Sequence, residues 1–435
     1  MNIFPGMKPF QLVLLGVFAF LLVLGLVLFS RFGGFGGSNA AVGTVTIWGT
    51  LPQSNMETVL NALRTSSQDY QSVQYVQKSE STFDSDLAQA IATGSGPDLV
   101  LISQELLVTE QTKLSVIPFS VISQRTYLDT YLPIFESFLA QNGTYGVPFA
   151  VDPLVMYYNR TALVQAGIAS PPATWEGVTS LTQQLTRASA GTVSQSTIPF
   201  GSYGNVENAR AIVSLLLLQA GNTISAVNSS GLHGTLTAVG SDNAAVTPAQ
   251  SALSFYTQFA DPVKTVYTWN SAVSSARQAF LSGSLVFYPG FASELPSLQA
   301  ANPNLDFDMT PIPQPQTTAQ RITYGKAYAF AIPAAAKNQA GAQKVALALA
   351  GSTFAPMISQ TLTMAPATRA SLTPASNDRY APVYYPQALI AKGWLSPSPA
   401  TTDAIFSTMI RNITSGSLSI GDALNTANQA LDAAL

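Results

Sequence analysis

NGTYGVPFAVDPLVMYYNRTALVQAGIASPPATW, residues 142–175, combines a turn, a strand, a short helix and a proline-rich corner. The apolar and aromatic run 154–158 predicts a strand. Residues 160–166 predict a helix that ends at Gly167. Thr174 stands where an N-cap would begin another helix at Trp175. This stretch therefore predicts strands and helices in alternation.

The same alternation continues on both sides of this stretch. Before it, strands are predicted at 44–48, 73–76 and 98–102, with helices at 56–64 and 83–91 between them. Later helices are predicted at 209–220, 248–259, 274–281, 338–350 and 420–435, with strands at 285–288 and 327–332 and an extended, proline-rich connection at 309–315. Short alternating units indicate a parallel sheet with crossover helices. Such sheets bind ligands beyond the carboxyl ends of their strands, so the loops after Trp48 and Ile102 are the first candidates.

Composition narrows the class of protein. The chain has 435 residues, of which 47% are apolar and 9% charged, and its net charge is −3. This length allows two or more domains. The charge balance does not favour nucleic-acid binding. The absence of cysteine excludes disulfides, thiol catalysis and cysteine-bound metal.

The N-terminal region predicts a membrane anchor. No charged residue lies between Lys8 and Arg31, and the apolar run 12–29 has the roughly 20-residue length that spans a bilayer as a helix. This length favours an uncleaved anchor over a signal peptide, for which 38–40 would be the cleavage site. We therefore expect an anchor at 1–30, a Gly-rich spacer at 31–43 and an extracytoplasmic bulk.

Four segments, in this order, carry a family resemblance. They are FDSDLAQAIATGSGPD at 83–98; the 142–175 stretch itself; QAFLSG at 278–283 with LVFYPG at 285–290 and Pro-Ile-Pro at 311–313; and Tyr-Gly at 324–325 with APATR at 365–369. Together they resemble extracellular solute-binding protein family 1, whose best-known members bind maltose and other oligosaccharides for ABC importers.

The resemblance implies an α/β fold with two lobes, of the type II-like periplasmic-binding-protein kind, with a hinge and an interlobe cleft behind the N-terminal transmembrane helix. The first lobe would comprise 44–149 and about 322–362, and the second 150–315 and about 363–435. It also implies a monomer that binds a carbohydrate and docks onto ABC permease subunits, while 12–29 contacts the lipid bilayer. No cofactor, metal, catalytic residue or nucleic-acid partner is expected.

A sugar receptor needs aromatic platforms and a few well-placed polar groups. Sheet geometry and the resemblance together imply these ligand-binding residues: Trp48, Thr50, Gln53, Ser54, Ser103, Gln104, Glu105, Asp152, Ser202, Tyr203, Asn205, Glu207, Phe291 and Tyr324. Tyr384 and Tyr385 are weaker candidates. Asp152 stands at the expected hinge, although its neighbour Pro153 also suits a turn. Ile102 replaces an aromatic residue of maltose binders, which argues against maltose itself.

Three alternatives stay open. The solute could be another neutral molecule, such as a peptide or a polyol. A membrane-anchored glycosidase could use Glu105 and Asp152 as its pair of carboxylates. The protein could also be a sensory receptor without a permease. The single histidine, His233, lies in a loop-like sequence and is expected to be a solvated surface residue.

Overall fold

The computed structural model describes residues 42–189, 192–240, 246–317 and 320–435. The predicted anchor at 1–30 and nearly all of the spacer at 31–43 lie outside the described residues. Within the described ranges, no helix has both the length and the apolar character needed to cross a membrane.

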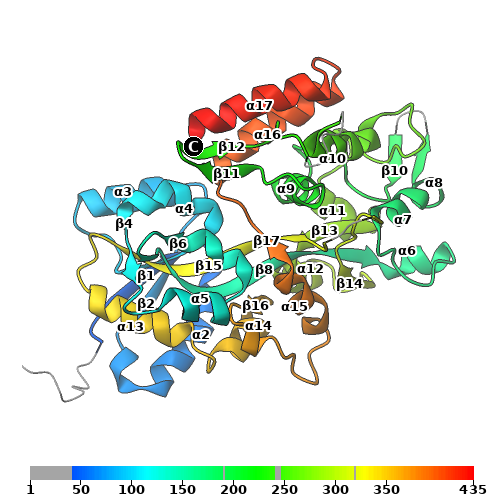
Figure 1. Cartoon of the computed structure of the whole chain (residues 1–435). Coiled ribbons are helices and arrows are strands. Elements are labelled where there is room, and N and C mark those ends of the chain that lie inside the picture. Colours follow the sequence, from blue (N-terminus) through cyan, green and yellow to red (C-terminus); the bar gives the residue numbers. More distant parts are fainter. Residues whose placement is uncertain (1–41, 190–191, 241–245, 318–319) are drawn as a thin grey trace, which may run out of the picture. The chain divides into compact units, whose positions relative to one another are not determined.

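A ten-stranded sheet organises the chain, with the strand order β13-β8-β15-β3-β1-β2 along its main path. Strands β1 (Val45–Gly49), β2 (Val73–Gln77) and β3 (Leu99–Ser103) are parallel to one another. Strand β15 (Thr323–Pro333) joins β3 antiparallel, and β8 (Val147–Asn159) joins β15 antiparallel. The predicted parallel sheet is therefore present, with antiparallel strands added from later in the chain (Figure 1).

Both faces of the parallel part are covered, because every residue of β3 is buried. Leu99 and Leu101 pack in one hydrophobic cluster, whereas Val100 and Ile102 pack in the other. The covering helices are α2 (Gln53–Ser66) and α13 (Gln339–Leu349) on the first face, and α3 (Phe83–Ala92) and α4 (Gln104–Glu110) on the second. Burial on both faces explains the continuous apolar sequence of β3. We call this part of the sheet with its helices the first lobe.

Strand β8 passes from the first lobe into a second one. Its first half pairs with β15, where Asp152 lies opposite Lys326. Its second half pairs on both edges with other strands, β13 (Phe287–Phe291) and β14 (Phe307–Pro311). The 13-residue strand β8 thus runs through both lobes of the α/β fold.

The other elements are shorter or pack around this sheet. The helices are α5 (Gln124–Thr130), α6 (Arg160–Gln165), α7 (Trp175–Ser180), α8 (Thr182–Leu185), α9 (Ala209–Gln219), α10 (Pro248–Thr257), α11 (Ala276–Leu281), α12 (Leu295–Ala301), α14 (Ala355–Leu362), α15 (Ala381–Leu389), α16 (Pro399–Thr414) and α17 (Ile420–Ala434). The strands are β4 (Leu114–Ser115), β5 (Ile117–Pro118), β6 (Leu139–Ala140), β7 (Gly143–Thr144), β9 (Arg187–Ser189), β10 (Thr192–Gln195), β11 (Ser225–Asn228), β12 (Gly231–Gly234), β16 (Ala365–Pro366) and β17 (Ala391–Lys392). The 3₁₀ turns are η1 (Gln68–Tyr70), η2 (Gln111–Lys113), η3 (Pro133–Phe138), η4 (Gln258–Ala260), η5 (Ala292–Glu294) and η6 (Arg369–Ser371).

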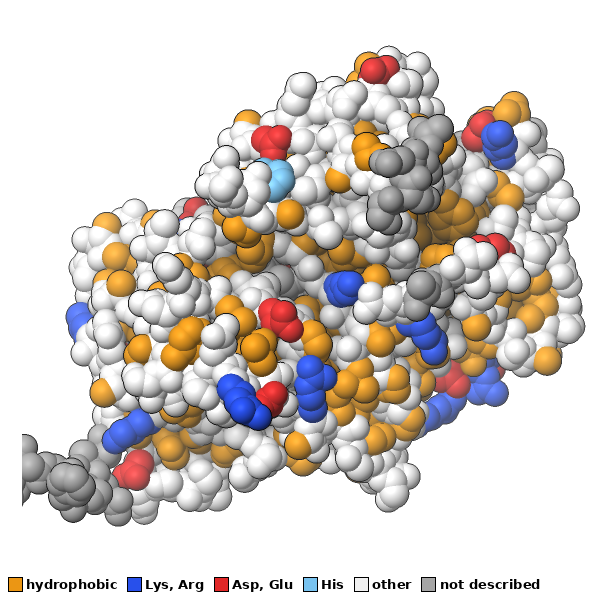
Figure 2. Space-filling model, in the orientation of Figure 1, with side chains coloured by type: hydrophobic (Ala, Val, Ile, Leu, Met, Phe, Trp, Pro, Cys, Tyr) orange, Lys and Arg blue, Asp and Glu red, His pale blue; other side chains and the backbone are white. Residues whose placement is uncertain are grey.

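Helix α9 is the central element of the second lobe. It packs against β15, α10 and α16, and nine of its eleven residues are buried. A helix that is apolar on all sides belongs in a core rather than on a surface. The α16–α17 pair and the β11–β12 hairpin lie beside it (Figure 1). Figure 2 shows only scattered charged side chains on this face, as the low charge content predicts.

Most predicted elements are present, and Thr174 caps α7 by accepting a hydrogen bond from the Gly177 N–H at 3.1 Å. Two expectations were wrong. The strand predicted at 285–288 was expected to end in a turn at Pro289 and Gly290, but both residues belong to β13, which lies at the end of the main strand path, where proline is tolerated. His233 was predicted in a loop, but it lies in β12 opposite Ala226.

Candidate ligand-binding site

A cavity of about 380 Å³ lies where β8 and β15 pass between the lobes. Its lining is Glu80, Asp152, Glu207, Asn208, Arg210, Ala211, Phe291, Ser293, Glu294, Lys326, Tyr328 and Asp403. These residues come from both lobes and from positions far apart in the sequence. Most of them are charged or polar, so the cavity suits a ligand with many hydrogen-bonding groups.

The pairing of β8 with β15 places two opposite charges in this cavity. Asp152 and Lys326 lie opposite each other in the antiparallel register, so their side chains leave the sheet on the same face. The Lys326 ammonium also lies 5.1 Å from the ring centroid of Phe291, within the range of a cation–π contact. Phe291 and Lys326 thereby bring an aromatic face and a cation together at the crossing strands.

Glu105, at the start of α4, is the centre of a buried charge network. Its carboxylate is 2% exposed and accepts a hydrogen bond from the Tyr324 hydroxyl at 2.5 Å. Lys326 Nζ lies at 3.4 Å and Arg210 Nη2 at 3.2 Å. Burial alone would raise the pKa of Glu105, but the two cations and the hydroxyl outweigh it and lower the pKa to about 2. Glu105 is therefore ionised at neutral pH.

Arg210 extends this network along α9 into the second lobe. Its Nη1 donates to Asp403 Oδ2 at 2.6 Å and to the Pro399 carbonyl at 3.1 Å. The Tyr203 hydroxyl donates to the other Asp403 oxygen at 2.6 Å. The Nε atom of Arg210 is buried and has no hydrogen-bond partner among the described residues.

Asp152 is buried on the hinge strand and held by one neighbour. Its Oδ1 accepts from the Ser293 N–H at 3.1 Å and its Oδ2 from the Ser293 hydroxyl at 2.5 Å. Burial raises the pKa of Asp152 to about 7, although the Ser293 hydrogen bonds and the Lys326 charge oppose the rise. Near neutral pH the carboxyl group is therefore poised between its two protonation states.

Glu294 fixes the end of β13, where Phe291 lies. It accepts hydrogen bonds from Asn208 Nδ2 at 2.7 Å, the Tyr288 hydroxyl at 2.7 Å and the Phe291 N–H at 2.8 Å. Gly290 allows this close packing, because a Cβ there would lie 2.8 Å from Tyr288 Cε1 and 3.0 Å from Glu294 Oε1. The loop after β13 is therefore rigidly held beside the cavity.

The structure brings together some of the predicted site residues. Asp152, Glu207 and Phe291 line the cavity. Glu105 and Tyr203 contact its lining through an ion pair to Arg210 and a hydrogen bond to Asp403, and Tyr324 donates to Glu105 behind the lining. The other predicted residues do not line it: Trp48, Thr50, Gln53, Ser54, Ser103, Gln104, Ser202 and Asn205.

Structural contacts occupy several of these remaining side chains. Gln104 donates to the Gly325 carbonyl at 3.0 Å and accepts from the Ala327 N–H at 2.6 Å, so it fastens α4 to β15. The Lys78 ammonium lies 3.8 Å from the ring centroid of Trp48. The weaker candidates are also engaged in packing, since Tyr384 is buried and its hydroxyl lies 2.7 Å from the Ser359 hydroxyl.

The sequence interpretation missed the two cations, Arg210 and Lys326, and their partners Glu80 and Asp403. The only sequence signal for Arg210 was a charge next to the apolar run of α9. Ser293 and Lys326 follow closely on the predicted Phe291 and Tyr324, so a wider window around those residues would have included them.

The two-lobed α/β fold and the polar cavity at its crossing strands define a solute-binding architecture. Residues 65–381 match the family described as bacterial extracellular solute-binding protein, and the chain belongs to that family. The resemblance read from the sequence is thereby confirmed. A search of curated protein sequences returns no match.

Several solved structures share the fold. An ABC transporter solute-binding protein from Thermotoga lettingae, bound with α-D-tagatose, has a TM-score of 0.67 and 17% identity, covering 90% of this chain and 99% of that chain. The GacH receptor of Streptomyces glaucescens has a TM-score of 0.70 and 14% identity, covering 90% and 98%. The cyclic α-maltosyl-1,6-maltose-binding protein of Arthrobacter globiformis has a TM-score of 0.69 and 18% identity, also covering 90% and 98%.

Proposed function

We propose that this protein captures a carbohydrate in the cavity between its two lobes and delivers it to an ABC importer. The observation that carries this proposal is the polar cavity at the β8–β15 crossing, which has side chains from both lobes in its lining. Fold neighbours include proteins whose names or complexes refer to tagatose and to a cyclic maltose derivative, which supports a sugar as the solute.

The chemistry of the cavity suits a sugar. Carboxylates such as Asp152 and Glu207 accept hydrogen bonds from hydroxyl groups, and Arg210 and Lys326 donate to their oxygens. Phe291 offers an apolar ring face against which a pyranose or furanose face packs.

The proposed lobes are 44–149 with about 322–362, and 150–315 with about 363–435. Their connections would act as the hinge, with β8 and β15 at its centre. Closure around the sugar is favourable when contacts to both lobes exceed the cost of closing.

We further propose a monomer anchored through 12–29 with its bulk outside the cytoplasm. A tether keeps the binding protein at a high effective concentration near its permease.

A binding role fits the two carboxylates better than glycoside hydrolysis does. A glycosidase needs one carboxylic acid that stays protonated until it donates its proton. The cations around Glu105 lower its pKa to about 2 despite its burial, so it does not hold a proton at neutral pH. Burial raises the pKa of Asp152 to about 7, so this carboxyl can carry a proton. Its partner in such a mechanism would be Glu105, which is ion-paired with Lys326 and Arg210 rather than free to act on a substrate.

A thermal-shift screen of the full chain in phosphatidylcholine nanodiscs, against a panel of mono- and oligosaccharides, polyols and short peptides, tests this proposal. At least one sugar is expected to raise the Tm of the protein. Glu207→Gln, in the cavity lining, should reduce the shift, whereas the control Glu57→Gln on α2 should leave it unchanged. A panel in which peptides or polyols shift the Tm and no sugar does would refute the carbohydrate proposal.

A further inference from the structure

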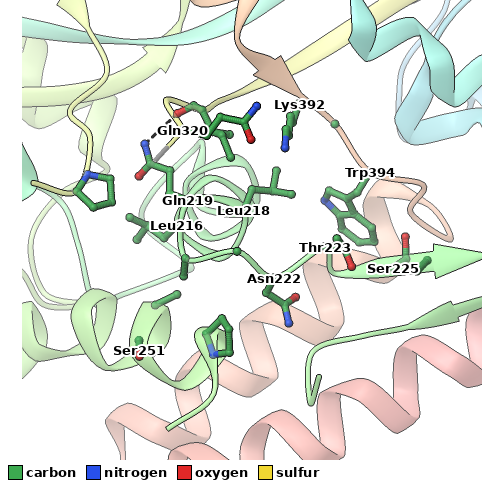
Figure 3. Close-up of a pocket in the computed structure, with 18 of the residues that line it drawn as sticks. Leu216, Leu218, Gln219, Asn222, Thr223, Ser225, Ser251, Gln320, Lys392 and Trp394 are labelled. Atoms are coloured by element: carbon green, nitrogen blue, oxygen red, sulfur yellow. Dashed lines mark hydrogen bonds between the residues drawn. The ribbon is translucent and has the colours of Figure 1, made fainter. Parts of the chain in front are cut away.

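A second and larger cavity, of about 1160 Å³, lies at the other end of α9. The N-terminal residues of α9 line the cavity at the crossing strands, whereas Leu216, Leu218 and Gln219 near its C-terminus line this one. The two cavities share no lining residue. An eleven-residue helix spans about 16 Å, so this is a separate place in the molecule. Figure 3 shows residues that line this second cavity.

The walls of the second cavity are largely apolar. Trp175, Leu216, Leu218, Phe255, Ile322 and Trp394 contribute to them. At its rim stand two of the exposed large hydrophobic side chains, Val227 at 72% and Val246 at 55% exposure. Its volume exceeds the roughly 300–1,000 Å³ of most small-molecule pockets. This hollow therefore has the size and surface to accept an elongated apolar body.

The amide groups in the lining are already engaged within the protein. Gln219 accepts from the Trp175 indole at 2.7 Å and donates to the Pro313 and Ile322 carbonyls at 3.0 and 2.9 Å. Asn222 donates to the Thr235 carbonyl and accepts from the Ile224 N–H. These amides leave little hydrogen-bonding capacity for a sugar, which separates this cavity chemically from the first one.

Lys392, at the end of β17, is the exception. Its side chain is exposed, and it has neither a salt bridge nor a side-chain hydrogen bond within the described part of the chain. Figure 3 shows its amino group directed toward the space between Leu218 and Trp394. The carboxylate in the same lining, Glu176, accepts from the Gln316 N–H at 3.0 Å. The cavity thus combines apolar walls with one available positive charge.

We propose that this second cavity is a binding site for an anionic amphiphile, an alkyl carboxylate whose chain packs on the apolar walls and whose carboxylate meets Lys392. Burial of the chain supplies most of the affinity, because each buried methylene strengthens binding by about fourfold. The exposed ammonium adds charge selectivity, and an exposed ion pair of this kind changes affinity by about threefold.

Titration calorimetry of the full chain in phosphatidylcholine nanodiscs, with empty nanodiscs as the blank, tests the proposal. Octanoate is expected to bind about threefold more tightly than octanol. Lys392→Gln should remove that preference and leave octanol binding unchanged, while the control Lys337→Gln, away from the cavity, should keep it. Octyl phosphate in place of octanoate shows whether a phosphate serves as well as a carboxylate.

A second variant tests the place of binding. Ser251 lies exposed on α10 and lines the cavity (Figure 3). Ser251→Trp should place a large ring in part of the hollow and weaken binding of both octyl compounds, with an unchanged circular dichroism spectrum and melting temperature. The proposal is overturned if wild type binds no octanoate, if octanoate and octanol bind equally, or if both bind Ser251→Trp as tightly as wild type. Binding of an apolar peptide in place of octanoate would identify the hollow as a protein-docking groove and would also overturn it.

Discussion

The Glu105 carboxylate and the Arg210 guanidinium form an ion pair at 3.2 Å that joins α4 of the first lobe to α9 of the second. Lys326 on β15 contacts the same carboxylate at 3.4 Å, and Asp403 contacts the same guanidinium at 2.6 Å. The charges beside the proposed sugar site therefore also hold its two sides together.

Removing Arg210 should destabilise the protein, because Glu105 is 2% exposed and would lose one of its two cations. For Arg210→Gln we expect a loss of about 3 kcal/mol in the free energy of unfolding, the low end for breaking a buried pair, since Lys326 remains. Arg411→Gln, on the exposed side of α16, should change it by less than about 0.5 kcal/mol. Urea unfolding measures both, and equal stabilities would show that the ion pair contributes nothing.

The ionisation of Asp152 should be visible in the pH dependence of the free energy of unfolding. Its pKa is raised to about 7 by burial, above its ordinary value, so between about pH 4 and 7 the folded state binds a proton that the unfolded state has lost. This group therefore makes the protein less stable as the pH rises through that range. Asp152→Asn should remove this contribution and flatten the profile of unfolding free energy between pH 4.5 and 7.5. Parallel profiles for wild type and variant would contradict the prediction.

The ionisation of Glu105 should make the protein more stable as the pH rises, in the opposite direction to Asp152 and at lower pH. Burial would raise the pKa of Glu105, but the cations and the Tyr324 hydroxyl lower it to about 2, below its ordinary value. Its contribution to stability is then complete above about pH 4.5 and is lost as the pH falls toward 2. Glu105→Gln should weaken the dependence of unfolding free energy on pH between 4.5 and 2.5. A variant as sensitive to acid as the wild type would show that other carboxylates account for the loss.

Gly290 should tolerate no side chain. A Cβ would lie 2.8 Å from Tyr288 Cε1 and 3.0 Å from both Tyr157 Cε2 and Glu294 Oε1. Gly290→Ala should cost about 1–3 kcal/mol through overpacking and weaken sugar binding by shifting Phe291. Gly204→Ala is the matched control, since no atom lies within 4 Å of a Cβ built there. Thermal unfolding distinguishes them, and similar melting temperatures would mean that the β13 loop adjusts freely.

Gln219 should stabilise the segment that leads from β14 to β15. Gln219→Leu leaves the Trp175 indole and the Pro313 carbonyl without this hydrogen-bond partner. A buried unsatisfied group costs about 1–3 kcal/mol, so the variant should unfold at lower urea concentration. Gln165→Leu on the exposed end of α6 serves as the control. If both variants unfold alike, water replaces the lost bonds.

The sequence predicted the fold well because hydrophobic periodicity and caps are local signals. The strand β3 and the helix α7 with its Thr174 cap follow directly from neighbouring residues. The same reasoning predicted only part of β8, since Pro148 and Pro153 interrupt its pattern while the pairing with β15 keeps it extended. In β8, the pairing with β15 therefore outweighs the local effect of the two prolines.

The site was predictable in part. Asp152 and Phe291 stand beside motifs that carry the family resemblance, and with Glu207 they line the cavity. Arg210 and Asp403 meet only after folding, because 192 residues separate them and neither belongs to a motif. Ion pairs between residues that are far apart in the chain produce no local pattern from which a single sequence could predict them.

Isothermal titration of the best sugar from the panel into the full chain tests most directly the claim that the ligand binds at the β8–β15 crossing. Asp152→Asn should weaken its affinity about tenfold or more, as expected for loss of a charge-assisted hydrogen bond, while Asp129→Asn on the exposed face of α5 should bind as the wild type does. Equal affinities for wild type and Asp152→Asn would contradict the proposed site.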